Sequence, residues 1–432
     1  MSPEVKKFIE TYIEDIESGD FQKVFSIARH MLTCAHVLEL QSRLCISGIC
    51  CKSECLSLCQ KNHRIHQIKC YNVGFGDCFL CKGENEDSAK MLVDFGGAKN
   101  FKMVKNDLKH EFSSADKRYL MLSHLHKDHY SGLTKVNDGS NVFLFDEIYL
   151  SDYIASGGIE FMGEVLLSSQ DNILLNLVRS ILKIPALLFR YVKDDTKVYL
   201  LCQGNVVYNS LCSFEVLLPL KNNKFYLHHR GDLEDLIRSF AKEYIKLLDY
   251  SPYSNGETSC IQVYSNNLGE VIDRLIDDLI QKGQERNVSV DEKILKERFD
   301  NYHNSLSLAF HELSVPDQKN VLFLGDAEPT DIDAIVKSGK VANQYYFVKV
   351  QHHGTKNHFY NALPTAQYYA ISNGGNRDSW EISALYDAQY GALRCINNCN
   401  CELAKKGVSC KSKAKTSGEC GTNASFISIK IT

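Results

Sequence analysis

The order of apolar and polar residues divides the chain into a helical beginning and a longer region of alternating strands and helices. Apolar residues near the start recur at helical spacing, at Val5, Phe8, Ile9, Tyr12, Ile13 and Ile16. From residue 68 onward, short apolar runs end in glycine or in a polar residue, as strands do. We therefore expect a helical module over residues 1–66 and an α/β domain over residues 67–432. The module could pack on that domain or bind a protein partner.

The first predicted strands of the α/β domain each lead to an aspartate beside glycines. The run 68–73 continues towards Asp77, and the run 91–93 continues into Asp94. A polar turn over residues 83–89 joins the strands on either side, which predicts a β-hairpin. Either aspartate alone fits an ordinary turn, but each can also orient a metal-binding side chain from behind.

Mainly helical insertions are expected over about residues 155–300, and they carry no evident chemistry. Helical spacing predicts helices over 159–182, 233–248 and 271–299. Strands are predicted over 186–201 and 214–220, the first of them folded as a hairpin around Asp194 and Asp195.

Four predicted strands in the second half of the chain carry polar groups at one end. They are 302–310 with His303 at its start, 320–324 before Asp326, 347–350 before His352 and His353, and 370–372 before Asn373. Because neighbouring strand ends meet at one edge of a sheet, we expect these side chains to lie close together.

The densest group of chemically active side chains follows the apolar run 119–122. It places His124, His126, Asp128 and His129 within six residues. Imidazole and carboxylate are ligands of zinc, iron and manganese. His124 and His126 lie two residues apart and can share one ion, whereas Asp128 and His129 suit a second. The stretch therefore predicts a site for two metal ions.

Composition narrows the class of protein further. The chain has 432 residues, 44% of them hydrophobic, and a net charge of -4, so it can build a sizeable core but offers no overall basic field for nucleic acid. No signal peptide is visible at the start, and no run reaches the roughly 18 apolar residues of a membrane span. We expect a cytoplasmic protein without membrane insertion.

Seventeen cysteines are unusual for such a chain, and they fall in clusters. The first cluster, over residues 50–59, can bind a metal ion or form one buried face of a helix. The last, over residues 395–420, is expected in a C-terminal hairpin, either as free thiols or as a small structural metal site. An odd total without a signal peptide argues against a secreted disulfide framework.

These motifs together resemble the metallo-β-lactamase fold superfamily. The residues that carry the resemblance are Val93-Asp94-Phe-Gly-Gly97, His124-Leu-His126-Lys-Asp128-His129, Leu324-Gly325-Asp326-Ala-Glu328 and His352-His353-Gly354. Within it the chain looks most like the hydrolase domain of the bacterial competence (DNA-uptake) protein family, through Val73-Gly-Phe-Gly-Asp77 and Lys349-Val-Gln-His-His-Gly-Thr355. The resemblance implies an αββα sandwich with metal ions at one edge.

The resemblance also implies roles for individual residues. His124 and His126 would bind the first ion, Asp128 and His129 the second, and Asp326 would bridge them. His353 would complete the second site and His303 the first, with Asp77 and Asp94 behind the ligands. Substrate contacts would come from His352, Lys349, Lys356 and Asn373. Zinc is the first choice of metal, with manganese and iron as alternatives.

The implied activity is metal-dependent hydrolysis by a hydroxide that two metal ions activate, with Asp128, Asp326 and His352 as catalytic residues. A phosphodiester in a nucleic acid or nucleotide is the preferred substrate. The alternatives are a carboxylic ester, lactone or amide, and a redox- or metal-responsive regulatory protein. DNA import is not expected, because the chain lacks the family's Tyr-Gly-His-Pro motif and its membrane segments.

Overall fold

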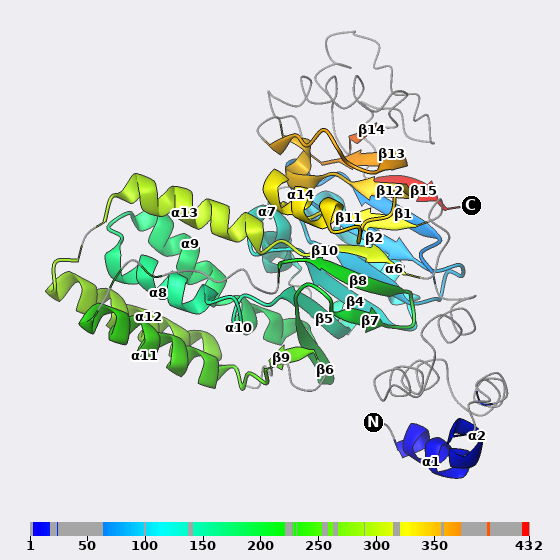
Figure 1. Cartoon of the computed structure of the whole chain (residues 1–432), viewed down its shortest axis with the longest axis horizontal. Helices are drawn as coiled ribbons and strands as arrows, with labels where there is room; N and C mark the ends of the chain where they lie inside the picture. The colour runs from blue at the N-terminus through cyan, green and yellow to red at the C-terminus, as the bar shows by residue number, and fades with distance from the viewer. Residues whose placement is uncertain are drawn as a thin grey trace, which may run out of the picture.

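Two β-sheets lie face to face at the centre of the molecule, and helices cover their outer faces (Figure 1). This arrangement is seen in a computed structural model. It describes residues 3–17, 24, 64–98, 101–136, 141–220, 227, 229, 231–252, 258–261, 267–288, 290–313, 320–355, 358–372, 395–397 and 426–431.

The first sheet has eight strands, and its central strands run parallel. Their order is β15 (Phe426–Lys430), β1 (Gln67–Tyr71), β2 (Phe79–Lys82), β3 (Lys90–Val93), β4 (Arg118–Leu122), β5 (Phe145–Ser151), β6 (Val192–Leu201) and β9 (Ser259–Ile261). Strands β3 to β6 are parallel, whereas β2 and β3 form the predicted antiparallel hairpin. The last strand of the chain, β15, pairs with the first strand of the sheet, β1.

The second sheet has seven strands. Their order is β14 (Cys395–Asn397), β13 (Thr365–Ile371), β12 (Gln344–Lys349), β11 (Val321–Phe323), β10 (Ala309–Glu312), β8 (Ser213–Leu218) and β7 (Val206–Tyr208). Strands β11 to β14 are parallel to one another, so their carboxyl ends lie along one edge.

Three hydrophobic clusters account for the layers. The middle cluster joins the sheets: the ring of Phe79 in β2 lies 5.7 Å from that of Phe323 in β11 and 6.3 Å from that of Phe347 in β12. The outer face of the first sheet packs on α6 (Lys105–Ser113) and on the helices between β5 and β10. The outer face of the second sheet packs on α14 (Pro329–Lys337) through Ile332 and Ile335. The order of layers is therefore αββα, as the resemblance implies.

The insertion forms a group of helices on one side of the sheets (Figure 1). These are α8 (Gly158–Ser168), α9 (Asn172–Leu182), α10 (Ile184–Leu188), α11 (Asp232–Leu247), α12 (Leu268–Glu285) and α13 (Glu292–Ser305). Among the described residues no single helix is long and apolar enough to cross a membrane; only the pair 172–182 and 184–191, bent by 49°, meets that test by length and composition.

Two predictions of local structure are wrong. The hairpin predicted over 186–201 does not form, because residues 186–191 are helical, in α10 and in the 3-10 turn Phe189–Tyr191, and Asp194 and Asp195 lie within the single strand β6. His303 lies in the last turn of α13 and not at the start of a strand, because Phe299 and Tyr302 face the helical core at helical spacing.

Several predicted features lie largely outside the described residues. Of the helical module over residues 1–66, the structure describes α1 (Pro3–Thr11), α2 (Ile13–Glu17), Val24 and residues 64–66. The cysteine cluster over 50–59 is not described, and only the strand 395–397 of the C-terminal cluster is.

Candidate metal centre

The polar residues singled out in the sequence meet where strands of both sheets end. The loop over residues 123–129, called the metal loop below, begins directly after β4. Asp128 and His129 lie at its end, in the short helix α7 (Lys127–Tyr130). Asp94 follows β3, Asp326 follows β11, and His353 follows β12 within the turn Gln351–Gly354. One edge of the sandwich thus gathers side chains that are more than 200 residues apart in the chain.

Two glycines bring the backbone close enough to fix the metal loop. Gly76 has a φ of +125°, and a Cβ there would lie 2.3 Å from the carbonyl oxygen of Asp128. Gly132 lies against Phe95, where a Cβ would approach the carbonyl oxygen to 2.2 Å. A side chain at either position would displace the loop, so these glycines are required for close approach.

Four donor atoms from the two sheets converge at this edge. His353 Nε2 lies 3.0 Å from Asp128 Oδ2 and 3.1 Å from Asp326 Oδ2. His129 Nε2 lies 3.3 Å from His353 Nε2, 3.5 Å from Asp326 Oδ2 and 3.8 Å from Asp128 Oδ2. His129, His353 and Asp326 are buried, and Asp128 is partly exposed.

The spacing of these donors fits a metal ion. Four ligands placed tetrahedrally at about 2.0–2.1 Å from zinc lie about 3.3–3.4 Å from one another. Five of the six distances among the four donors span 3.0–3.8 Å, close to this value. Nitrogen and carboxylate oxygen are also the ligands that zinc, manganese and iron accept.

A second set of donors shares Asp326. His124 Nε2 lies 3.0 Å from His126 Nδ1 and 3.7 Å from Asp326 Oδ2, and the three donors lie within 4.8 Å of one another. The ring of His303 lies 5.3 Å from that of His126, outside this set. Its Nε2 is buried and has no hydrogen-bond partner in the described part of the chain. His303 thus lies next to His126, and its Nε2 is available to bind a metal ion.

Two aspartates orient the imidazole rings of His129 and His353. Asp94 accepts a hydrogen bond from His129 Nδ1 at 2.8 Å and is itself held by the amide and hydroxyl of Ser123. Asp77 Oδ1 lies 3.2 Å from His353 Nδ1. Each aspartate engages the rear nitrogen of a ring, so that Nε2 is directed towards the donor cluster.

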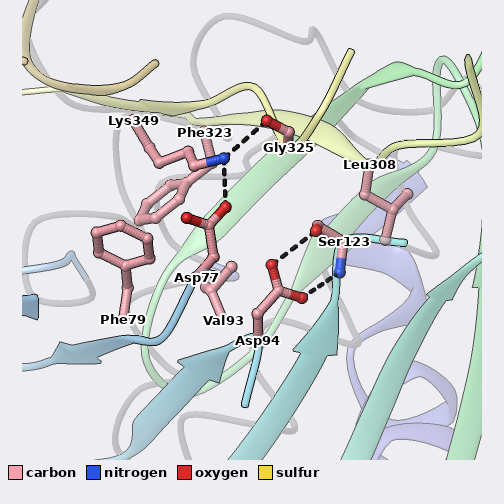
Figure 2. Close-up of a pocket in the computed structure, with 9 residues that line it drawn as sticks. All are labelled: Asp77, Phe79, Val93, Asp94, Ser123, Leu308, Phe323, Gly325 and Lys349. Carbon is pink, nitrogen blue, oxygen red and sulfur yellow. Dashed lines mark hydrogen bonds and ion pairs between the residues drawn. The ribbon is translucent and has the colours of Figure 1, made fainter. Parts of the chain in front are cut away.

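Lys349 is buried behind the carboxylates. Its ammonium donates to the carbonyl of Gly325 at 2.7 Å and contacts Asp77 (Figure 2). It also lies 3.4 Å from Asp326 Oδ1. The sequence suggests a substrate contact for Lys349, but its side chain is only 2% exposed. Its placement instead favours a role in holding Asp77 and Asp326.

The base of the site rests on the core between the sheets. Figure 2 shows Asp77 and Lys349 beside the apolar side chains of Phe79 and Phe323, and Asp94 beside Ser123. Such surroundings strengthen the interactions between the charged groups. They also make each of these groups costly to leave without a partner.

The charges of the site favour a bound cation. Four carboxylates, Asp77, Asp94, Asp128 and Asp326, surround the imidazoles of His129 and His353, and the ammonium of Lys349 lies behind them. Burial alone would lower the pKa of His129, but the surrounding carboxylates raise it to about 10. The carboxylates thus draw protons onto a histidine, as an excess of buried negative charge should.

Protonation differs between the two sets of donors. Burial lowers the pKa of His124 and of His126, so both rings stay neutral, which is the form that binds a metal ion.

Burial would raise the pKa of Asp77, but Lys349 and His353 lower it to about 2. That of Asp326 also lies well below its usual value, against the effect of burial, because His353 and His129 are close.

His352 occupies a different place from His353. Its Nδ1 lies 4.0 Å from Asp326 Oδ2, whereas His353 Nε2 lies 3.1 Å from the same oxygen. Both histidines have left-handed backbones, with φ of 45° and 55°, and Gly354 follows with φ of 70°. Left-handed residues other than glycine are strained and concentrate at functional sites.

The remaining predicted contacts, Lys356 and Asn373, lie outside the described residues. The structure adds residues that sequence patterns did not single out. Ser123 holds Asp94, and Ser372 donates to Asp77. Phe75 is 40% exposed, with its ring 4.5 Å from that of His353. Position next to a ligand was the only signal for Ser123; nothing in the sequence indicated Ser372.

Comparison with known proteins adds little to this geometry. No protein-family model matches the chain, and no curated protein matches it significantly. Among solved structures the chain is similar to a B3 metallo-β-lactamase with an active-site glutamic acid. The two are 10% identical, the match covers 52% of this chain and 90% of that one, and the TM-score is 0.21. A TM-score this low assigns the chain to no family.

Proposed function

We propose that this protein is a metal-dependent hydrolase with two divalent ions at the edge of the sandwich. The observation that carries the proposal is the convergence of His129, His353, Asp128 and Asp326 at the spacing of metal ligands. Asp94 engages Nδ1 of His129 and Asp77 engages Nδ1 of His353, which supports the same assignment.

One ion would be held by Asp128, His129 and His353, and the other by His124 and His126. Asp326 lies close to His124, His129 and His353 and would be shared, and His303 is the candidate to complete the set of His124 and His126. Bound there, two divalent ions would activate water and neutralise charge that develops on the substrate. Zinc suits this mixture of imidazole and carboxylate, and manganese and iron remain alternatives.

The protein's own residues would arrange the reaction. Lys349 fixes Asp326 and Asp77 from behind, and Asp94 fixes the ring of His129. His352 has one nitrogen near Asp326 without a hydrogen-bond partner among the described residues, and it is proposed to contact a substrate oxygen.

A phosphodiester is the proposed substrate. Two-metal sites suit in-line displacement at phosphorus, and the motifs resemble those of the nuclease-like competence hydrolases. The net charge of -4 favours a nucleotide or other small phosphoester over long nucleic acid. The regulatory alternative receives no support from the buried cysteines Cys78, Cys81 and Cys212, because burial raises the pKa of each thiol and so reduces its reactivity.

The test combines metal content with turnover. Metal-loaded protein should contain two ions per chain by mass spectrometry and should hydrolyse bis-p-nitrophenyl phosphate. Asp128→Ala and Asp326→Ala should lose both properties, whereas the exposed control Asp195→Ala should keep them. A protein that binds no metal at this site would refute the proposal. Turnover of p-nitrophenyl acetate or a lactone alone would replace the phosphodiester by an ester.

A further inference from the structure

Beside the proposed ligands, two histidine rings are stacked. The centroids of His352 and His358 lie 3.5 Å apart, and the ring planes differ by 4°. Neither ring belongs to the two donor sets that share Asp326. His358 has no role so far, although it lies only five residues after His353 in the sequence.

His358 is fixed by partners on both of its nitrogens. Its Nδ1 lies 2.9 Å from the hydroxyl of Thr355, and its Nε2 lies 3.6 Å from Glu328 Oε1. Glu328 is itself held by Asn304, whose Nδ2 donates to the same oxygen at 2.7 Å. Gln351 donates to the backbone carbonyl of His358 at 2.6 Å. The ring is therefore held both by its own nitrogens and by its backbone.

His352, in contrast, keeps one nitrogen unused. Its Nδ1 is buried, lacks a hydrogen-bond partner in the described part of the chain, and lies 4.0 Å from Asp326 Oδ2. Its left-handed backbone, with φ of 45°, is a conformation that the surroundings must maintain. The stack with His358 is one contact that can do so.

A third metal site is the competing interpretation, since donors of Glu328, His352 and His358 lie within 4.8 Å of one another. A metal ion lies close to the plane of an imidazole that binds it, because the lone pair of the nitrogen lies in that plane. The two rings are nearly parallel with centroids 3.5 Å apart, so one ion cannot lie in both planes. The geometry therefore favours a packed pair.

We propose that His358 is a positioning residue that holds the His352 ring with its free nitrogen towards the substrate beside Asp326. This inference rests on the proposed function, because it assumes that His352 contacts a substrate oxygen. The chain of contacts runs from Asn304 through Glu328 and His358 to His352. Its effect on turnover would pass through His352 alone.

A double-mutant cycle tests the dependence on His352. His358→Ala should lower kcat on bis-p-nitrophenyl phosphate by about tenfold or more, with two ions still bound and KM changed less than kcat. His358→Phe keeps a flat ring under His352 and should recover most of this loss. In a His352→Ala background, His358→Ala should cause no further loss. His110→Ala, an exposed histidine on α6, is the control.

Three results would overturn the inference. The first is an equal loss from His358→Ala with and without His352, and the second is loss of a third bound ion in His358→Ala. The third needs no turnover: a crystal structure of His358→Ala in which the His352 ring has not moved. A wild-type protein without metal or turnover would instead refute the proposed function, and that crystal structure would still decide the role of His358.

Discussion

Replacement of Glu111 by glutamine is expected to destabilise the fold without changing the metal centre. Glu111 lies on α6, and its carboxylate meets three buried lysines on the outer face of the first sheet. Its oxygens lie 2.6 Å from Lys69 Nζ and 2.9 Å from both Lys82 Nζ and Lys90 Nζ. The side chain of Glu111 is 5% exposed and that of Lys90 is 0% exposed, so solvent screens these contacts little.

The size of the effect follows from the shifted ionisation of Glu111. Burial would raise the pKa of this carboxyl, but Lys69, Lys82 and Lys90 lower it from 4.5 to about 2. A shift of this size corresponds to roughly 3 kcal/mol. Loss of one partner from a buried ion pair typically costs about 3–5 kcal/mol. Lys69 keeps Asp107 and Lys82 keeps Glu86, so we expect a cost of about 3 kcal/mol.

The pH dependence has a defined sign. Because the pKa of Glu111 is lower in the folded than in the unfolded protein, its contribution is complete above about pH 4.5 and is lost as the pH falls towards 2. The stability difference between wild type and Glu111→Gln should therefore shrink between about pH 5 and pH 3.

Urea unfolding at several pH values measures both effects. Glu86→Gln is the matched control, because Glu86 also pairs with Lys82 but is 85% exposed, and it should cost less than about 1 kcal/mol. A Glu111→Gln protein whose stability lies within about 1 kcal/mol of wild type, or an equal loss in the control, would contradict the buried ion cluster. Metal content per folded chain should be equal in all three proteins.

Three further substitutions test the metal centre. Gly76→Ala would place a Cβ 2.3 Å from the Asp128 carbonyl oxygen, and metal binding should weaken at least tenfold in a chelator competition. Gly97→Ala is the control and should not weaken metal binding, because its Cβ would have no neighbour nearer than 3.8 Å. Asp94→Asn removes the acceptor of His129 Nδ1 and should lower metal affinity by about 10–100-fold; unchanged affinity would contradict its orienting role. Lys349→Met leaves Asp77 and Asp326 buried without their ammonium and should destabilise the metal-free protein by about 3–5 kcal/mol in urea unfolding. Lys117→Met removes a half-exposed lysine and is the control; a larger loss from Lys117→Met would contradict the role of Lys349.

The sequence predicted the parts of the site whose residues are adjacent in the chain. His124, His126, Asp128 and His129 form one short motif, so their proximity needed no knowledge of the fold. The strand ends that carry Asp326 and His353 were also visible, because apolar runs stop directly before them. Their meeting with the loop followed only from the resemblance, since pairing of distant strands leaves no local pattern.

Other features depend on contacts that the sequence does not show. Asp194 and Asp195 favour a turn by residue type, but they lie within β6, at the irregularity between its pairs Phe145–Val192 and Glu147–Lys197 with β5. Lys349 is expected from the sequence to contact substrate, but its ammonium is buried against Asp77 and Asp326. The stack of His352 on His358 lies beside the left-handed turn at 352–354, and neither feature leaves a pattern in the sequence.

The origin of the donors in both sheets has a consequence for the lifetime of the protein. Asp128 and His129 follow strand β4 of the first sheet, and Asp326 and His353 follow strands of the second. A bound ion would therefore link the two sheets of the sandwich and stabilise their packing. Metal at a thousand times its dissociation constant would add about 4 kcal/mol to the stability. Metal supply would then set how long the folded chain survives, as well as how fast it works.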